Sequence, residues 1–281
     1  MIHEKINLKD YFPGIQTDAT LTSYVRSNSD EIEPGRRRAT ILICPGGGYW
    51  FTCSREAEPV ALEFLARGYN AFVLDYSTRN RATVRYPAQL LEASAAMAYI
   101  RRNSEHYNVK ENAVAVCGFS AGGHLAASLA TLWNEDFIAD ILGLAAGENR
   151  PDGLILGYPV ITSGEYAHRE TFTYLLGEDP EEGLLEKLSL ENVVGAHMPP
   201  AFLWHTLNDD GVPSENTFLF AKAMKAAQVP FELHIYPEGV HGLALGTRET
   251  RDALINREND HVTSWISLCA AWLGRYLDTE R

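Results

Sequence analysis

The stretch AVAVCGFSAGGH, residues 113–124, carries the strongest fold signal in the chain. Its first five residues are small or β-branched and apolar, which predicts a buried strand, and the small residues after Ser120 predict a closely packed helix. The pattern G-x-S-x-G, from Gly118 to Gly122, lies between them. A strand, a sharp turn and a helix in this order present a serine hydroxyl at the end of a sheet. Ser120 is therefore a candidate nucleophile, and the competing interpretation is a serine that caps a buried helix.

The same alternation extends in both directions along the chain. Apolar runs predict strands at 41–43, 71–74, 113–117, 154–156, 201–204 and 231–236, and helical spacing is found at 56–67, 88–102, 214–228 and 262–277. Strands that alternate with helices predict an α/β fold, a mostly parallel central sheet with helices on both faces. Residues 1–38 lack a helical period, and we expect them to add antiparallel edge strands.

One long segment interrupts the alternation. The 40 residues from Ile161 to Pro200 separate two predicted strands, which is longer than an ordinary connection. We predict a cap or lid insertion at about 161–200 within a single domain that spans residues 1–281.

The charge balance argues against several classes of partner. The chain carries 24 Lys and Arg against 37 Asp and Glu, a net charge of −13, and so acidic a surface repels nucleic acid and anionic membrane headgroups. No run reaches the roughly 18 to 20 apolar residues that span a bilayer, and the N-terminus has no signal-like apolar core. We therefore expect a cytoplasmic protein. The sequence leaves its oligomeric state open, a homo-oligomer included.

The four cysteines, Cys44, Cys53, Cys117 and Cys269, form no CxxC pair and no metal-type spacing with histidine. Buried reduced thiols are the expected state, and we predict neither a metal site nor an organic cofactor.

Two candidate partners for Ser120 follow later strands. His241 lies between Gly239 and Gly242 after the strand that ends at Tyr236, which suits an imidazole that must reach a serine as its base. Asp209 and Asp210 follow the strand at 201–204, and the spacing favours Asp209 as the acid that orients the base. His124 and His205 are expected to be structural.

A glycine-rich turn, residues 45–50 (PGGGYW), directly follows the predicted strand at 41–43. The backbone N–H groups of Gly47 and Gly48, with that of Ala121, form a candidate oxyanion hole. A phosphate loop is disfavoured because no Lys-Ser/Thr pair follows. Candidate substrate contacts, for which plain core packing is the alternative, are the following residues: Tyr49, Trp50, Phe51, Tyr166 and His168.

With these residues assembled, the chain resembles the α/β-hydrolase superfamily, and within it the bacterial esterase and lipase group that includes acetyl-xylan and related sugar acetyl esterases. The resemblance runs from about Ile41 to Leu277. It rests on CPGGGYW (44–50), SREAEPVA (54–61), YPAQLLE (86–92), AVCGFSAGGHLAASLATLW (115–133), PDGLILGYPVITSGEYAH (151–168), LWHTLNDDGVP (203–213) and EGVHGL (238–243). It implies Ser120 as nucleophile, Asp209 as acid, His241 as base, and Gly47, Gly48 and Ala121 as oxyanion donors. Pro45 stands where the hormone-sensitive-lipase group has the histidine of HGGG.

The resemblance implies a serine hydrolase of small acyl esters, with acetylated sugars or short oligosaccharides as substrates. Two alternatives stay open at this point. Gly47-Gly48-Tyr49-Trp50 is also similar to arylformamidases, which are amide hydrolases. A catalytically silent α/β-hydrolase that serves as a binding module is the other.

Overall fold

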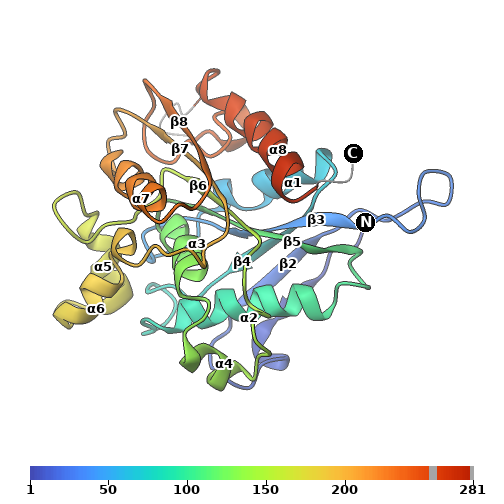
Figure 1. Ribbon diagram of the computed structural model, residues 1–281, viewed down its shortest axis with the longest axis horizontal. Helices are drawn as coiled ribbons and strands as arrows, with labels where there is room; N and C mark the ends of the chain where they lie inside the picture. Colours follow the sequence, from blue (N-terminus) through green and yellow to red (C-terminus); the bar gives the residue numbers. More distant parts are fainter. Residues whose placement is uncertain (253–257, 279–281) are drawn as a thin grey trace.

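The computed structural model describes residues 1–252 and 258–278, and in them eight strands form one sheet (Figure 1). The strands are β1 (Lys5–Asn7), β2 (Thr20–Tyr24), β3 (Arg38–Cys44), β4 (Asn70–Asp75), β5 (Val109–Phe119), β6 (Gly153–Gly157), β7 (Ala201–Thr206) and β8 (Phe231–Tyr236). Their order across the sheet is β1-β2-β4-β3-β5-β6-β7-β8. β2 pairs antiparallel with both of its neighbours, β1 and β4. The six strands from β3 to β8 all run parallel to one another. The predicted α/β fold is confirmed, including antiparallel strands at the N-terminal edge.

Helices cover both faces of this sheet because successive strand residues point to opposite sides. Leu42 joins a core under the helices α2 (Ala88–Arg102), α3 (Ser120–Leu132), α4 (Asp136–Leu142) and α7 (Glu215–Ala226). Its neighbour Ile43 joins the core under α1 (Glu58–Ala66) and α8 (Trp265–Tyr276). Figure 1 shows α2 and α4 on one side of the sheet and α1 and α8 on the other.

The boundaries differ from the predicted ones in places. The helix expected over 56–67 begins at Glu58 and follows a 3-10 turn, and α4 was not predicted at all. The five 3-10 turns of the described residues are η1 (Leu8–Asp10), η2 (Ser54–Glu56), η3 (Leu190–Asn192), η4 (Arg248–Thr250) and η5 (Val262–Ser264).

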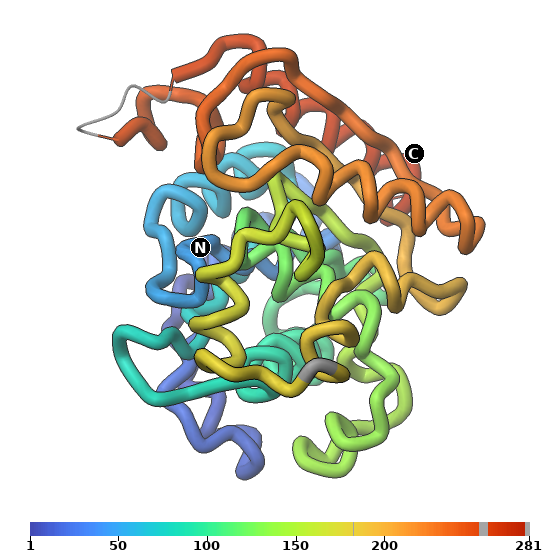
Figure 2. Tube along the Cα trace, turned by 90° about the vertical axis from the view of Figure 1, so that its left-hand side faces the viewer, coloured from blue at the N-terminus to red at the C-terminus, as the bar shows by residue number. Residues whose placement is uncertain are grey.

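The inserted segment 161–200 carries two helices, α5 (Arg169–Leu176) and α6 (Glu182–Lys187), followed by η3. It is tied to the body of the protein: the Tyr86 N–H donates to the Leu175 carbonyl, 3.0 Å between N and O. In Figure 2 this yellow segment lies between the orange and red C-terminal part and the turquoise α2. Its action as a cap stays a prediction, as does the assignment of the chain to one domain.

The parallel strands place their carboxyl ends at one edge of the sheet, which is where open α/β sheets assemble their sites. The glycine-rich turn follows β3, Ser120 follows β5, Asp209 follows β7 and His241 follows β8. Among the described residues no helix is long and apolar enough to cross a membrane. The four cysteines are buried and unbonded.

Candidate active site

Ser120 sits at the sharp turn between β5 and α3, with a φ of +52°. A non-glycine residue reaches this region only where its surroundings hold it there. The flanking glycines make the turn sterically feasible: a Cβ on Gly118 would lie 2.1 Å from the Gly122 carbonyl oxygen, and one on Gly122 would lie 2.1 Å from that of Cys44. The G-x-S-x-G spacing therefore reflects two close backbone contacts.

The loop after β8 brings His241 to this serine. Its Nε2 lies 2.8 Å from Ser120 Oγ, and its Nδ1 lies 2.8 Å from Asp209 Oδ2. The ring also packs edge-on against Tyr158, 5.1 Å between centroids. Three residues that follow three different strands thus form one chain of hydrogen bonds, as the sequence predicts.

Asp209, and not Asp210, has its side chain against the imidazole. Its carboxylate is fully buried and accepts the backbone N–H groups of Gly211 (2.9 Å) and Val212 (2.8 Å). Burial alone would raise the pKa of Asp209, but hydrogen bonds from His205 and His241 outweigh it and hold that pKa well below its ordinary value. Asp210 is exposed and accepts the backbone N–H of His241 at 2.8 Å.

His124 and His205, which also lie near the site, are buried and satisfied by hydrogen bonds. His124 donates from Nε2 to the Leu188 carbonyl (2.9 Å) and accepts the Tyr49 hydroxyl at Nδ1 (3.0 Å). Burial lowers the pKa of His124 to about 4, so the ring is neutral at pH 7. His205 Nε2 lies 3.3 Å from Asp209 Oδ2, so that carboxylate oxygen contacts a second imidazole besides that of His241.

Residues 45–52, which we call the glycine loop, lie beside the serine. Gly47 has a φ of +121° and Gly48 a φ of +66°, and a Cβ on Gly47 would lie 2.1 Å from the Phe51 carbonyl oxygen. Nothing in the described part of the chain accepts a hydrogen bond from the N–H of either glycine. Ala121 is the second residue of α3, where N–H groups have no acceptor within the helix. These donors suit an oxyanion.

A cavity of about 220 Å³ opens at Ser120. Its lining comes from the glycine loop, from η2, from the loop after β8 and from the inserted segment: Gly47, Gly48, Phe51, Cys53, Arg55, Glu56, Ser120, His168, Asp210, Val240, His241 and Gly242. His168 is half-buried, and burial followed by the nearby His241 lowers its pKa. It is the predicted substrate contact that reaches this cavity from the inserted segment.

Of the other predicted substrate contacts, Phe51 also lines the cavity, whereas Tyr49, Trp50 and Tyr166 do not. Tyr49 is 1% exposed, and its ring packs in the core against Tyr76 and His124, so the prediction that its side chain faces a substrate is wrong for this structure. Trp50 is 45% exposed, precedes the cavity residue Phe51 in the chain and packs against Tyr174, 5.1 Å between centroids. Tyr166 is half-buried and does not line the cavity.

Arg55 and Glu56 have no role predicted from the sequence, although both lie in the stretch SREAEPVA and both line the cavity. The Arg55 guanidinium donates to the Gly242 carbonyl, next to His241. The signal that could have found them was a pair of charged residues just ahead of an apolar helix.

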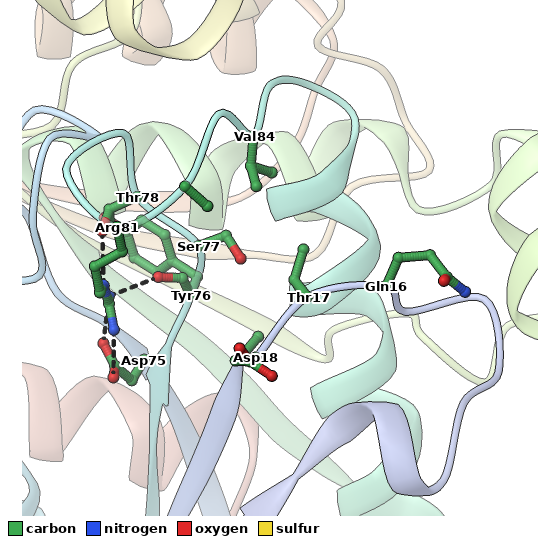
Figure 3. Close-up of a pocket in the computed structure, with 11 residues that line it drawn as sticks. Gln16, Thr17, Asp18, Asp75, Tyr76, Ser77, Thr78, Arg81 and Val84 are labelled. Atoms are coloured by element: carbon green, nitrogen blue, oxygen red, sulfur yellow. Dashed lines mark hydrogen bonds and ion pairs between the residues drawn. The ribbon is translucent and has the colours of Figure 1, made fainter.

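A second cavity, of about 250 Å³, is lined by residues 16–19, 75–78, 81, 82 and 84 (Figure 3). Arg81 lies at one side of it and binds both oxygens of Asp75, at 2.7 and 2.8 Å. Thr52 donates to Asp75 (2.6 Å), and the Tyr76 hydroxyl donates to the carbonyl of Pro45 (2.6 Å). The charged groups are therefore paired with each other, and the network fixes both ends of the glycine loop.

Comparison with known proteins places this geometry in a family. The chain is 42% identical over 219 residues to an endo-1,4-beta-xylanase B of Butyrivibrio fibrisolvens, which covers 76% of this chain and 34% of that protein. It is 29% identical over 213 residues to an acetylxylan esterase of Xylanibacter ruminicola, covering 74% of this chain and 41% of that protein. The chain thus spans about a third to two fifths of these relatives.

A solved structure matches nearly the whole chain. The acetyl ester-xyloside bifunctional hydrolase of Caldicellulosiruptor lactoaceticus is 36% identical, with a TM-score of 0.80 over 97% of this chain and 96% of that one. The BD-FAE family profile matches residues 32–224. The resemblance to bacterial α/β-hydrolase esterases is confirmed, and the chain belongs to the BD-FAE family.

Proposed function

We propose that this protein is a carboxylic ester hydrolase that uses Ser120, His241 and Asp209 as a catalytic triad. The observation that carries the proposal is the chain of contacts from Ser120 Oγ through His241 to the buried Asp209, each step 2.8 Å long. A serine hydroxyl becomes nucleophilic at neutral pH when a base takes its proton and a carboxylate orients that base.

The reaction follows from the positions of these atoms. His241 Nε2 takes the Ser120 proton as Oγ attacks the acyl carbonyl, and the Nδ1–H of His241 donates to Asp209. The carbonyl oxygen becomes an oxyanion, which the N–H groups of Gly47, Gly48 and Ala121 stabilise; a single such donor contributes roughly 3 kcal/mol. His241 then protonates the departing alcohol, and a water activated by the same imidazole releases the acid from the acyl-enzyme.

The substrate class we propose is small acyl esters, acetyl groups on sugars or short oligosaccharides above all. A relative and a structural neighbour are named for acetylxylan and for acetyl ester-xyloside hydrolysis. The cavity of about 220 Å³ favours a small acyl group, because pockets that bury drug-sized ligands measure roughly 300 to 1,000 Å³. Exposed Trp50, packed on Tyr174, offers an apolar ring face beside the cavity for a sugar.

A fluorophosphonate tests the activated serine directly. We expect one covalent adduct on the intact protein by mass spectrometry, mapped to the peptide that contains Ser120, and none on folded Ser120→Ala. A folded wild-type protein without an adduct would contradict the proposal and favour a silent binding module.

A substrate comparison then separates the ester and amide alternatives. We expect acetylated xylo-oligosaccharides to be deacetylated with a higher kcat/KM than that for N-formylkynurenine. The reverse order would favour an arylformamidase.

A further inference from the structure

The glycine loop depends on a buried carboxyl group that the triad does not use. Glu56, in the 3-10 turn η2, is 2% exposed. Its Oε2 accepts the backbone N–H of Gly46 at 2.7 Å, and its Oε1 accepts the hydroxyl of Tyr158 at 2.7 Å. Both oxygens are therefore occupied by donors from two separate parts of the chain, 10 and 102 residues away.

The Gly46 peptide lies directly against the serine. A Cβ at Gly46 would lie 2.7 Å from Glu56 Oε2, 2.8 Å from the Phe119 carbonyl oxygen and 2.9 Å from the Ser120 Cβ. The N–H that Glu56 accepts belongs to the Pro45–Gly46 peptide, which is separated only by the Gly46 Cα from the peptide that carries the Gly47 N–H. The orientation of the first peptide therefore helps to set where the following N–H groups point. Pro45, just before it, has no N–H to contribute.

Tyr158 extends this contact to the histidine loop. Its hydroxyl oxygen accepts the N–H of Ala244 at 2.9 Å, and its ring packs edge-on against His241. Burial, and then the neighbouring Glu56, keep the pKa of the Tyr158 phenol well above its ordinary value, so it retains the proton that it donates. Glu56 is thus connected to the glycine loop on one side and to the loop of His241 on the other.

We propose that Glu56 is a positioning residue for the oxyanion hole. It fixes the N–H of Gly46 so that the following N–H groups face the carbonyl attacked by Ser120. Through Tyr158 it also holds the His241 loop in place relative to those N–H groups. This inference rests on the proposed function. A misplacement of catalytic groups by about 1 Å costs on the order of 10²-fold in rate, which sets the expected effect.

The test measures the hydrolysis of 4-nitrophenyl acetate by Glu56→Met and Glu56→Gln. For Glu56→Met we expect kcat to fall about 10²-fold with KM within about threefold, because the lost interaction acts in the transition state. Glu56→Gln should keep kcat within about fivefold, since its amide oxygen can still accept the Gly46 N–H and its NH₂ can donate to Tyr158. An alkyl trifluoromethyl ketone, which forms a tetrahedral oxyanion on Ser120, should bind Glu56→Met more weakly by about the factor lost in kcat/KM.

Asp152→Leu is the control. Asp152 also accepts a backbone N–H, that of Val114, at 2.9 Å, and it pairs with Arg101 at 2.7 Å, but it lies just before β6, at the edge of the sheet opposite the site. Asp152→Leu should lower the free energy of unfolding as Glu56→Met does and leave kcat within about threefold. If Glu56→Met does not unfold cooperatively, Glu56→Asp replaces it, because the carboxyl group is withdrawn by about 1.5 Å and the same loss of kcat is expected.

An unchanged kcat in Glu56→Met, or an equal loss in Asp152→Leu, would overturn the positioning role. Equal rates for the wild-type protein and Ser120→Ala would instead overturn the proposed function, so the two failures are distinguishable.

Discussion

Replacing Asp209 with asparagine changes one atom of the triad while keeping the shape of the side chain. Its Oδ1 accepts two backbone N–H groups and lies 3.0 Å from His241 Nδ1, while its Oδ2 lies closer to that nitrogen (2.8 Å) and also faces a ring nitrogen of His205 (3.3 Å). In Asp209→Asn the amide oxygen stays on the backbone donors, so the NH₂ group takes the place of Oδ2. It then donates to His241 Nδ1, which forces the imidazole proton onto Nε2, where it faces the serine and blocks proton transfer.

The magnitude follows from this tautomer change. We expect kcat to fall about 10⁴-fold, the size found for an acid-to-amide change in serine protease triads, or about 5 kcal/mol at 1.36 kcal/mol per factor of ten. The free energy of unfolding should fall by only about 2 kcal/mol, about 1 for each backbone N–H that loses a charged acceptor. Because the pKa of Asp209 is lowered in the folded protein, this stabilisation is fully present above about pH 4 and is lost as the pH falls further.

The assay is 4-nitrophenyl acetate hydrolysis with urea unfolding at several pH values, and Asp210→Asn is the control. Asp210 accepts the His241 backbone N–H, which an asparagine oxygen can also accept, so we expect at most a few-fold change in kcat. If Asp209→Asn kept more than about a tenth of the wild-type kcat, or if Asp210→Asn lost about 10³-fold, Asp209 would not be the acid.

Three further changes test other parts of the structure. Gly122→Ala places a Cβ 2.1 Å from the Cys44 carbonyl oxygen, so we expect the free energy of unfolding to fall by about 2 kcal/mol or more. The control Gly183→Ala, whose Cβ meets nothing within 4 Å, should leave that free energy unchanged or higher. Equal urea midpoints for the two variants would contradict this. Burial lowers the pKa of His124 to about 4, so as the pH falls from about 6.5 the unfolded chain binds a proton at this residue before the folded protein does. The free energy of unfolding of the wild-type protein should therefore fall by about 3 kcal/mol by pH 4. If that free energy falls just as steeply with pH in His124→Gln, His124 is not the source. Trp50→Ala should lower kcat/KM about tenfold for acetylated xylo-oligosaccharides and spare 4-nitrophenyl acetate, and equal losses on both substrates would rule out a sugar contact.

The sheet, and the meeting of Ser120, Asp209 and His241 at its edge, could be predicted from the sequence because their signals are local. Buried parallel strands appear as short apolar runs, and G-x-S-x-G encodes backbone contacts within a few residues of Ser120. The placement of Asp209 and His241 needed only the rule that the carboxyl ends of parallel strands share an edge. Helix α4 was missed because seven residues, Asp136–Leu142, are too few to show a clear period.

Contacts between segments far apart in the chain could not be predicted from the sequence. Tyr49, Trp50 and Phe51 form an aromatic run in which the backbone conformation decides which ring enters the core, and the positive φ of Tyr49 turns that ring inward. Glu56 gave no signal because its two partners become neighbours only when the chain is folded. A buried acid of this kind looks, in a sequence, like any surface acid at the start of a helix.

The positions of the proposed triad residues in the sheet have a consequence for inactivation. Ser120 follows β5, which is flanked by β3 and β6, while His241 follows β8, which pairs with β7 alone among the described strands. Edge strands fray at a lower free-energy cost than strands with two neighbours. Transient fraying of β8 would carry the imidazole away from a serine whose own strand is still intact. Under mild heat or denaturant, activity should therefore disappear before most of the secondary structure does, and it should return as soon as this one strand docks again.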